Sequence, residues 1–279
     1  MSKTPQQKIV IKMSSRKAFV GGVAGCGLVL ASRPSGAFAQ MYAPPYSLVA
    51  SADLGHSGEL RTLRFAPERG VVPVKCLAAL LPRESFGAKI VELRNRKRAY
   101  SAVVDVARAS RASVVVNGGF FDFDRFVPDG LLVLEGKTLS NARADYSTAI
   151  DIDRNGVLAI VPTDEAKSAA FAVQGHPALV DAGGKMGMHS EEGSLARRTF
   201  VAQSGETVIV AITSEVTLYH LADALVQYPD AFGCTRIDAA LNLSGDESSG
   251  FYARLADGSE AIERATWPAR EVLVFSPRA

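Results

Sequence analysis

The stretch that decides the fold is VVVNGGFFDFDRFVPDGLLVLEGK, which runs from Val114 to Lys137. At its start the apolar, β-branched run ASVVV predicts a buried strand over 112–116. Asn117 and two glycines, Gly118 and Gly119, follow at the strand exit. Glycines there permit unusual backbone angles and leave room for a ligand against the main chain. The segment is therefore either a tight structural turn or a place where backbone amides and the Asn117 side chain face an anion.

Segments on both sides of this stretch predict many strands and few helices. Strands are expected at 72–81, 89–93, 131–134, 148–152, 158–161, 200–203, 207–212, 236–243 and 271–275, and helices at 99–110 and 217–227. Thr217 is the expected N-cap of the second helix. This order predicts an α+β fold, with a mixed, largely antiparallel sheet and a few packed helices in a single domain. Residues 40–70 are expected to form an irregular lead-in with short strands, and 71–279 to form the domain itself.

The length and composition support a large core and limit the classes of partner. The chain has 279 residues, 47% of them apolar, which is enough for one large domain or two small ones. Its net charge is +2, but residues 1–39 hold six of the 31 Lys and Arg and no acid. The rest therefore has 25 cations against 29 Asp and Glu, a balance of −4. A mildly acidic body without a basic stripe argues against nucleic acid as the main partner.

Residues 1–39 have the pattern of an export signal. A basic region ends in SSRKAF, an apolar run covers 18–31, and the small residues Ala37 and Ala39 suit cleavage before Gln40. The run is too short and too rich in glycine to be a comfortable permanent membrane span. We therefore expect a periplasmic or secreted protein without a membrane span after the signal is removed.

Catalytic and metal-binding motifs with a fixed spacing are absent from the sequence. It contains no HExxH, no CxxC pair, no P-loop and no GxSxG elbow. No spacing demands a metal, although acidic and carbonyl oxygens cluster in the loops, which is compatible with a divalent cation such as calcium. After signal removal two cysteines remain, Cys76 and Cys234, which either form a disulfide or stay as buried free thiols.

Two further segments carry polar residues next to expected strands. QGHPALVDAGGK, at 174–185, contains His176, which is either a hydrogen-bonded structural histidine or a ligand-binding residue. Arg197 and Arg198 precede the strand at 200–203. Either one of them clamps a phosphate with its planar fork of donors, or the pair is a solvated strand edge.

Six segments occur along the chain in a characteristic order: VNGGFF, PDGLLVLEGK, QGHPALVDAGGK, ARRTFVAQSGETVIVAI, TLYHLADAL and GCTRIDAALNLSGDESS. In this order they resemble the phosphodiester glycosidase family, which includes the enzyme that uncovers mannose-phosphate tags by removing N-acetylglucosamine, and many exported bacterial proteins. The resemblance covers roughly residues 75–275, and NGGFF with ALNL is its most specific part. It implies a single mixed α+β domain and the cleavage of a sugar from a sugar-1-phosphodiester.

The resemblance also implies a set of substrate-binding residues. The positions that match the motifs of the family are Asn117, Gly118, Gly119, Arg198, Asn242, Gly245 and Ser248 or Ser249. Together they would arrange amide donors, a guanidinium and a carboxylate around one phosphorylated sugar. We include His176 and Ser244 among the candidate substrate-binding residues.

The sequence departs from the family at Ser244, where the family has an aspartate. A serine hydroxyl cannot act as a base, nucleophile or cation ligand of comparable strength. Two small positions of the family are Asp246 and Glu247 here, which either supply the missing carboxylate or crowd the ligand. A glycosidase normally uses two carboxylates, so the catalytic candidates are Asp246, Glu247 and Asp129. The chain is then either an exported hydrolase of glycosyl-1-phosphodiesters of envelope or exopolysaccharide type, or a degenerate member that binds a phosphorylated glycan without cleaving it.

Overall fold

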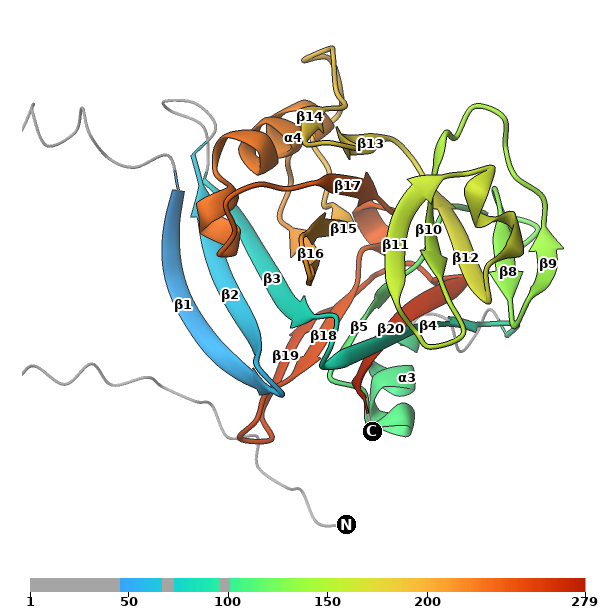
Figure 1. Ribbon diagram of the computed structural model, residues 1–279, viewed down its shortest axis with the longest axis horizontal. Helices are drawn as coiled ribbons and strands as arrows, with labels where there is room; N and C mark the ends of the chain where they lie inside the picture. The colour runs from blue at the N-terminus through green and yellow to red at the C-terminus, as the bar shows by residue number, and fades with distance from the viewer. Residues whose placement is uncertain (1–45, 67–72, 96–100, 279) are drawn as a thin grey trace, which may run out of the picture. The chain divides into compact units, whose positions relative to one another are not determined.

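Strand β5 (Val114–Asn117) is covered on both faces, which explains its continuous apolar sequence. The computed structural model describes residues 46–66, 73–95 and 101–278 (Figure 1), so the expected export signal lies outside the described residues. Side chains alternate along β5: Val114 and Val116 belong to the main core, and Val115 packs with residues of helix α3 (Ala102–Ser110). A strand buried on both faces favours apolar residues, as at Val114, Val115 and Val116.

β5 is the middle strand of a five-stranded sheet. The order is β19 (Glu260–Glu263), β18 (Phe251–Arg254), β5, β20 (Glu271–Pro277) and β4 (Phe86–Glu92). The buried residues Val103 and Ala107 of α3 pack with Val115 and Val274 of this sheet. In Figure 1 this sheet and α3 lie in the lower part of the view, next to the C-terminus.

An eight-stranded sheet contains β15 and β17, the strands next to Arg198 and Ser244. Its order is β1 (Tyr46–Gly55), β2 (Gly58–Phe65), β3 (Val74–Pro82), β16 (Thr207–Thr213), β15 (Thr199–Ser204), β17 (Ala239–Asn242), β13 (Ala178–Asp181) and β14 (Lys185–Met186). β15 and β17 are antiparallel, with Phe200 opposite Asn242. The first residues of β15 and the last residues of β17 therefore lie side by side, at the same end of the sheet.

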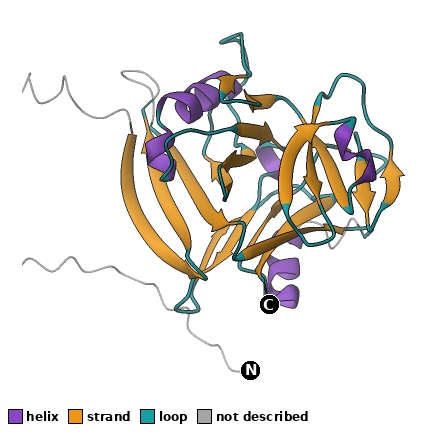
Figure 2. Ribbon diagram, viewed as in Figure 1, coloured by secondary structure: helices purple, strands orange, loops and turns teal. Residues whose placement is uncertain are grey.

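A third sheet has five shorter strands. Its order is β11 (Leu158–Pro162), β10 (Thr148–Ile152), β12 (Phe171–Gly175), β8 (Leu132–Leu134) and β9 (Lys137–Ser140), and β6 (Phe121–Asp122) pairs separately with β7 (Val127–Pro128). The strand pairings in all these sheets are antiparallel. The expected α+β class with a largely antiparallel sheet is confirmed, and strands dominate it (Figure 2).

The main core lies between the three large sheets. It contains residues from each of them, among them Leu77, Val116, Leu132, Ile150, Val201, Leu241 and Leu273. Helix α4 (Leu218–Gln227) packs Leu221 and Leu225 in a second cluster with residues of the eight-stranded sheet. As expected, Thr217 is the N-cap of α4: its side chain accepts a hydrogen bond from the His220 amide at 3.2 Å.

Where the sequence predicted an irregular lead-in with short strands over 40–70, residues 46–65 form two long paired strands, the β1–β2 hairpin. The two strands pair along residues 46–65 and join the eight-stranded sheet through β3. Residues 47–51 are exposed on the edge strand β1, so the sequence there lacks the alternation that marks a half-buried strand. All described elements belong to one unit, 44–279, and a single domain for the whole chain stays a prediction.

The two cysteines are free thiols in this structure, which is the second of the two expected alternatives. Cys76 is buried in β3, and Cys234 is half-buried and donates to the Pro229 carbonyl at 3.1 Å. Burial raises the pKa of both thiols. Within the described ranges, no helix is long and apolar enough to cross a membrane.

Candidate active site

Asn117 joins the ends of β5 and β17 to the start of β15. Its side chain is fully buried. Oδ1 accepts hydrogen bonds from Thr199 Oγ1 at 2.8 Å and from the Gly250 amide at 3.0 Å. Nδ2 donates to the Ser244 carbonyl at 2.6 Å and to the Gly118 carbonyl at 3.4 Å. No hydrogen-bonding capacity is left for a ligand. This corrects the expectation that Asn117 contacts the substrate: the side chain instead fixes the loop after β17.

Gly118 and Gly119 lie directly against β20 and β12. A Cβ at Gly118 would be 2.7 Å from Glu271 Cγ, and one at Gly119 would be 2.7 Å from the Gln174 carbonyl oxygen. The Gly118 amide donates to the Glu271 carbonyl at 2.9 Å, and the Gly119 amide donates to Glu271 Oε1 at 2.7 Å. Close packing therefore requires both glycines. Their amides do not face an anionic ligand, contrary to the expectation from the sequence.

Glu271, which receives these bonds, was not singled out in the sequence. It begins β20, is 1% exposed, and has a buried Oε2 with no hydrogen-bond partner in the described part of the chain. Burial raises its pKa to about 8, although the Gly119 amide and Arg270 favour the ionised form. The only sequence signal is a charged residue at the head of the apolar run EVLVF.

The loop that follows β17 is held mainly by main-chain atoms. The Ser244 amide donates to the Gly118 carbonyl at 3.1 Å, and the Asp246 amide donates to the Arg197 carbonyl at 2.7 Å. The buried Ser249 hydroxyl also donates to the Arg197 carbonyl, at 3.3 Å. Ser249 therefore helps to hold the loop against Arg197. The hydrogen bonds that fix the path of the loop do not involve the side chains of Ser244 and Asp246.

Asp246 and Glu247 are the exposed residues of this loop and begin a short 3₁₀ turn, Asp246–Ser248. Asp246 has φ of 55°, in the left-handed region that glycine adopts most easily and that Asp tolerates better than most residues. Glycine would fit this backbone without strain. The chain instead presents a carboxylate here.

A cavity of about 330 Å³ opens beside the loop. Six of the residues indicated by the sequence line it: Arg198, Ser244, Gly245, Asp246, Glu247 and Ser248. Aromatic side chains form much of the remaining wall, namely Phe120, Phe121, Phe123 and Trp267. Phe120 and Phe121 are both half-buried in this wall.

Arg198 is the cation of this cavity. Its guanidinium is half-buried: Nε donates to the Val216 carbonyl at 3.2 Å and Nη2 to the Ser194 carbonyl at 2.7 Å. Both acceptors are neutral, and none of the ion pairs among the described residues includes Arg198. Burial lowers its pKa, and the nearby Asp246 carboxylate opposes this change. A half-buried guanidinium with neutral partners is a suitable site for a phosphate.

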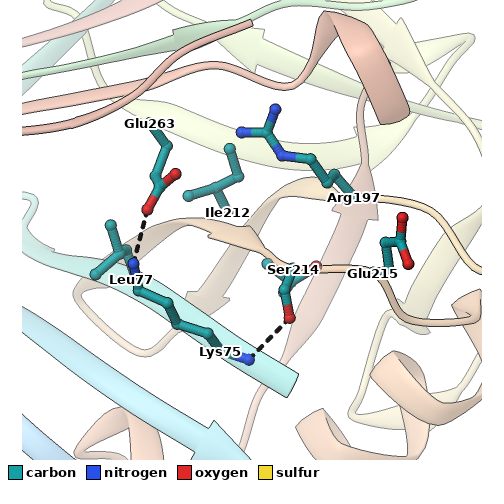
Figure 3. Close-up of a pocket in the computed structure, with 8 residues that line it drawn as sticks. Lys75, Leu77, Arg197, Ile212, Ser214, Glu215 and Glu263 are labelled. Atoms are coloured by element: carbon teal, nitrogen blue, oxygen red, sulfur yellow. Dashed lines mark hydrogen bonds and ion pairs between the residues drawn. The ribbon is translucent and has the colours of Figure 1, made fainter. Parts of the chain in front are cut away.

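The neighbouring Arg197 lines a different cavity, of about 300 Å³ (Figure 3). There Lys75 Nζ pairs with Glu263 at 2.7 Å, and Arg197 Nη1 donates to the Arg264 carbonyl at 3.0 Å. Consecutive side chains of an extended backbone point to opposite faces, which explains why the two arginines separate. Of the two arginines, only Arg198 shares a cavity with the loop carboxylates.

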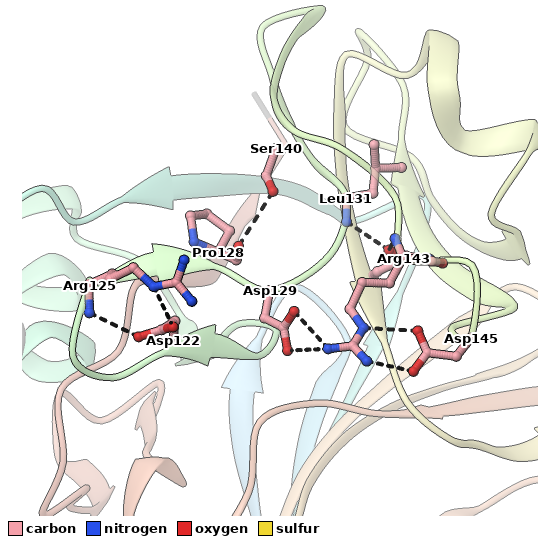
Figure 4. A network of polar contacts seen from close by, with 9 residues as sticks. Asp122, Arg125, Pro128, Asp129, Leu131, Ser140, Arg143 and Asp145 are labelled. Carbon is pink, nitrogen blue, oxygen red and sulfur yellow. Dashed lines mark hydrogen bonds and ion pairs between the residues drawn. The ribbon is translucent and has the colours of Figure 1, made fainter.

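Asp129 and His176 are not among the residues that line the Arg198 cavity. Both Asp129 oxygens accept from Arg143 Nη1, at 3.0 and 2.9 Å, and Arg143 also pairs with Asp145 at 2.6 Å (Figure 4). The exposed His176 ring stacks on Tyr146, with centroids 4.8 Å apart. Arg143 neutralises Asp129, so the structure does not group this carboxylate with the loop carboxylates, contrary to expectation.

Asn242, at the end of β17, also lies outside the lining of the cavity. It is 2% exposed, and its Nδ2 donates to the His176 carbonyl at 2.7 Å. Its Oδ1 is buried without a hydrogen-bond partner among the described groups. Asn242 therefore contributes to the framework next to the site, where it leaves one acceptor unused.

No cluster of three or more His, Cys, Asp and Glu side chains in the described ranges is arranged to hold a metal ion. Asp129 and Asp145 are both engaged by Arg143. The expected compatibility with calcium therefore stays a prediction.

Comparison with known proteins identifies the family to which the chain belongs. A model of the phosphodiester glycosidase family matches residues 110–275, more than half of the chain. The chain belongs to the phosphodiester glycosidase family. This confirms the resemblance seen in NGGFF and ALNL, and it supports a glycosidase-type function. No curated protein matches the sequence at a significant level.

Solved structures support the same fold. The catalytic domain of zebrafish N-acetylglucosamine-1-phosphodiester alpha-N-acetylglucosaminidase, autoinhibited by its pro-peptide, matches with a TM-score of 0.59 and 16% identity, over 84% of this chain and 89% of that chain. A hypothetical protein from Synechocystis matches with a TM-score of 0.59 and 13% identity, over 79% of this chain and 62% of that chain. At these identities the likeness establishes a shared fold.

Proposed function

We propose that this family member is an exported hydrolase that cleaves a sugar from a glycosyl-1-phosphodiester of envelope or exopolysaccharide type. One observation carries the proposal: Arg198, a half-buried guanidinium with neutral hydrogen-bond partners, lines the same cavity as Asp246 and Glu247. Water attacks the anomeric carbon, the bond from that carbon to the phosphate oxygen breaks, and the products are a free sugar and a phosphomonoester.

Arg198 binds the phosphate of the substrate in this proposal. A guanidinium presents a planar fork of N–H donors that matches two phosphate oxygens. Its Nε and Nη2 are already held by the Val216 and Ser194 carbonyls, so the side chain is oriented before the ligand arrives. Orientation before binding reduces the entropy lost on binding.

Asp246 is the proposed base that activates water, and Glu247 is the second carboxylate. Asp246 and Arg198 line the same cavity, and the Asp246 carboxylate favours the charged form of the guanidinium. A departing phosphomonoester is a stable anion, with a second pKa of about 6, so it needs less protonation than a sugar alkoxide. The demand for a strong general acid is therefore smaller than in an ordinary glycosidase.

Ser244 has the role of a hydrogen-bonding residue. Its backbone is fixed by Gly118 and Asn117, and its side chain lines the cavity without a hydrogen bond to another described residue. A hydroxyl at this position can donate to or accept from a sugar hydroxyl. In this proposal the carboxylate expected at 244 is supplied from Asp246.

The experiment is a hydrolysis assay of the purified protein. The substrate is the methyl phosphodiester of α-glucose 1-phosphate or of N-acetylglucosamine 1-phosphate, and the release of reducing sugar is measured. Asp246→Asn is the informative variant, because Asn tolerates the left-handed backbone of this position and lacks the charge. We expect turnover that falls about 100-fold or more in Asp246→Asn and that survives in the control Asp129→Asn. Equal loss in both variants contradicts the assignment.

The second candidate function is binding without cleavage, and Ser244 is the observation that favours it. The hydroxyl stands where the family signature has a carboxylate. If this candidate is correct, the natural protein binds the phosphodiester without turnover and Ser244→Asp gains activity. That pair of results would exclude the proposed hydrolase.

A further inference from the structure

Trp267 is an exposed aromatic residue at the wall of the Arg198 cavity. It is the only tryptophan of the chain and is 41% exposed, in the loop between β19 and β20. Its ring centroid lies 4.5 Å from that of Phe123, with an interplanar angle of 38°. Large aromatic side chains are usually well buried, so an indole left exposed beside a cavity calls for an explanation.

The loop of Trp267 is fixed to the loop that carries the carboxylates. The amides of Thr266 and Trp267 both donate to the Glu247 carbonyl, at 2.8 and 2.9 Å. Trp267, Phe123 and Arg198 line one cavity of about 330 Å³. The aromatic pair is therefore held in a set position relative to the loop carboxylates, although it comes from two segments far apart in the sequence.

We infer that Trp267 and Phe123 form a platform for a pyranose ring, against which a sugar stacks while its phosphate binds Arg198. The C–H groups of one face of a pyranose are apolar and slightly positive, and they match the negative face of an indole. The hydroxyls of the other face and edge can reach polar groups of the same cavity, such as Ser244 and Ser248. This inference rests on the proposed function and assigns the two residues that position the sugar ring in that site.

A purely structural role of the pair does not explain the exposure. If Trp267 only packed the loop, contact with Phe123 would bury the indole, whereas two fifths of the residue stays accessible. The loop is already fixed by the two main-chain bonds to Glu247. The free part of the ring is therefore available to a ligand.

The sole tryptophan makes the test direct, because selective tryptophan excitation reports on Trp267 alone. N-acetylglucosamine 1-phosphate and glucose 1-phosphate are titrated as ring-containing probes, and glycerol 1-phosphate and inorganic phosphate as probes without a ring. We expect a saturable change of emission with the two sugar phosphates and none with the others. An equal change with glycerol 1-phosphate, or calorimetric binding of sugar phosphates without any change, overturns the inference.

A pair of variants separates ligand binding from packing. Trp267→Ala removes the ring, and Trp267→Phe keeps a flat aromatic surface. We expect calorimetry to show about three- to tenfold weaker binding of the sugar phosphates to Trp267→Ala, near-natural binding to Trp267→Phe, and unchanged binding of inorganic phosphate to both. A loss of inorganic phosphate binding in Trp267→Ala at an unchanged melting temperature shows that the indole supports the Arg198 site itself, and this overturns a role confined to stacking.

These binding measurements do not depend on turnover, so the inference and the proposed function can fail separately. An emission change with sugar phosphates but no hydrolysis supports the platform and removes the hydrolase. Hydrolysis with the same KM in the natural protein and in Trp267→Ala supports the hydrolase and removes the platform.

Discussion

The two loops that follow β5 and β17 start alike and end differently. Each begins after a buried strand that closes on an asparagine, Asn117 or Asn242. In the first loop, which we call closed, the Asn117 side chain is fully hydrogen-bonded and the amides of Gly118 and Gly119 donate to Glu271. The second loop is open, with exposed carboxylates and a hydroxyl beside a cavity. A polar strand exit is thus part of the framework in one case and lines a cavity in the other, and only the long-range contacts distinguish the two.

The sharpest test of this difference compares the two asparagines. Asn117→Ala leaves the Gly250 amide, the Ser244 carbonyl and the Thr199 hydroxyl unpaired in a buried place, so we expect a loss of about 3–5 kcal/mol of stability. Asn242→Ala removes one hydrogen bond, but it also removes a buried Oδ1 that has no partner among the described groups. The loss of unfolding free energy should therefore be about 1 kcal/mol or less. Urea unfolding measures both, and equal losses would show that the two loops are not different in this way.

The next largest effect concerns the two adjacent arginines. Arg198→Ala should weaken binding of a glycosyl phosphodiester about 10- to 100-fold, because charge-assisted hydrogen bonds to the phosphate are lost. Arg197→Ala is the matched control, since Arg197 lines the other cavity, and it should change binding less than about twofold. Calorimetric titration and melting temperatures of both variants check this. A larger effect from Arg197 would move the phosphate site to the cavity of Figure 3.

The closed loop also predicts a pH dependence. The folded protein keeps Glu271 protonated up to a pKa of about 8, against 4.5 for an ordinary Glu, so the unfolded chain releases this proton first. Its contribution to stability is complete below about pH 4.5 and is lost as the pH rises through about 8, with a slope of at most about 1.4 kcal/mol per pH unit.

Glu271→Gln cannot titrate and still offers an oxygen to the Gly119 amide. Urea unfolding of both proteins at several pH values between 5 and 8 should therefore show a smaller decline in the variant. Parallel curves for the two proteins would mean that Glu271 is already ionised in the fold.

The smallest effect is expected in the open loop, at Asp246. Its φ of 55° is strained for most residues and free for glycine, so stability should follow the order Gly, Asp, Ala over a range of about 1 kcal/mol. Thermal unfolding of Asp246→Gly and Asp246→Ala measures this order. A stable Asp246→Gly without hydrolytic activity would separate the chemistry of the carboxylate from the shape of the loop.

The sequence predicted those elements whose cause is local. The apolar runs gave β5 and β20, and the cap at Thr217 gave the start of α4. Over 40–70 the sequence predicted only short strands, because the exposed edge strand β1 carries no apolar alternation that would indicate its length.

For the candidate site, Arg198 and the residues of the open loop line one cavity, and their role in binding stays a prediction. The expectation that the closed loop faces a ligand was wrong. Asn117 bonds to a residue 82 positions away, and Gly119 bonds to a carboxylate 152 positions away. No local pattern contains such pairings. Trp267 was missed for the same reason, since its neighbour Phe123 lies in another segment.

Main-chain atoms carry the loop after β17, and this has a consequence for how such a site can change. The Ser244, Asp246 and Glu247 side chains take no part in the bonds to Gly118, Arg197, Thr266 and Trp267 that hold the loop. The hydrogen bonds that hold the loop therefore do not depend on which side chains stand at these three positions, although the left-handed backbone at Asp246 favours Gly, Asp or Asn. Substitutions at Ser244 and Glu247 are therefore expected to leave the main-chain hydrogen bonds of the loop in place, so that the chemistry of the cavity can be changed separately from the path of the backbone.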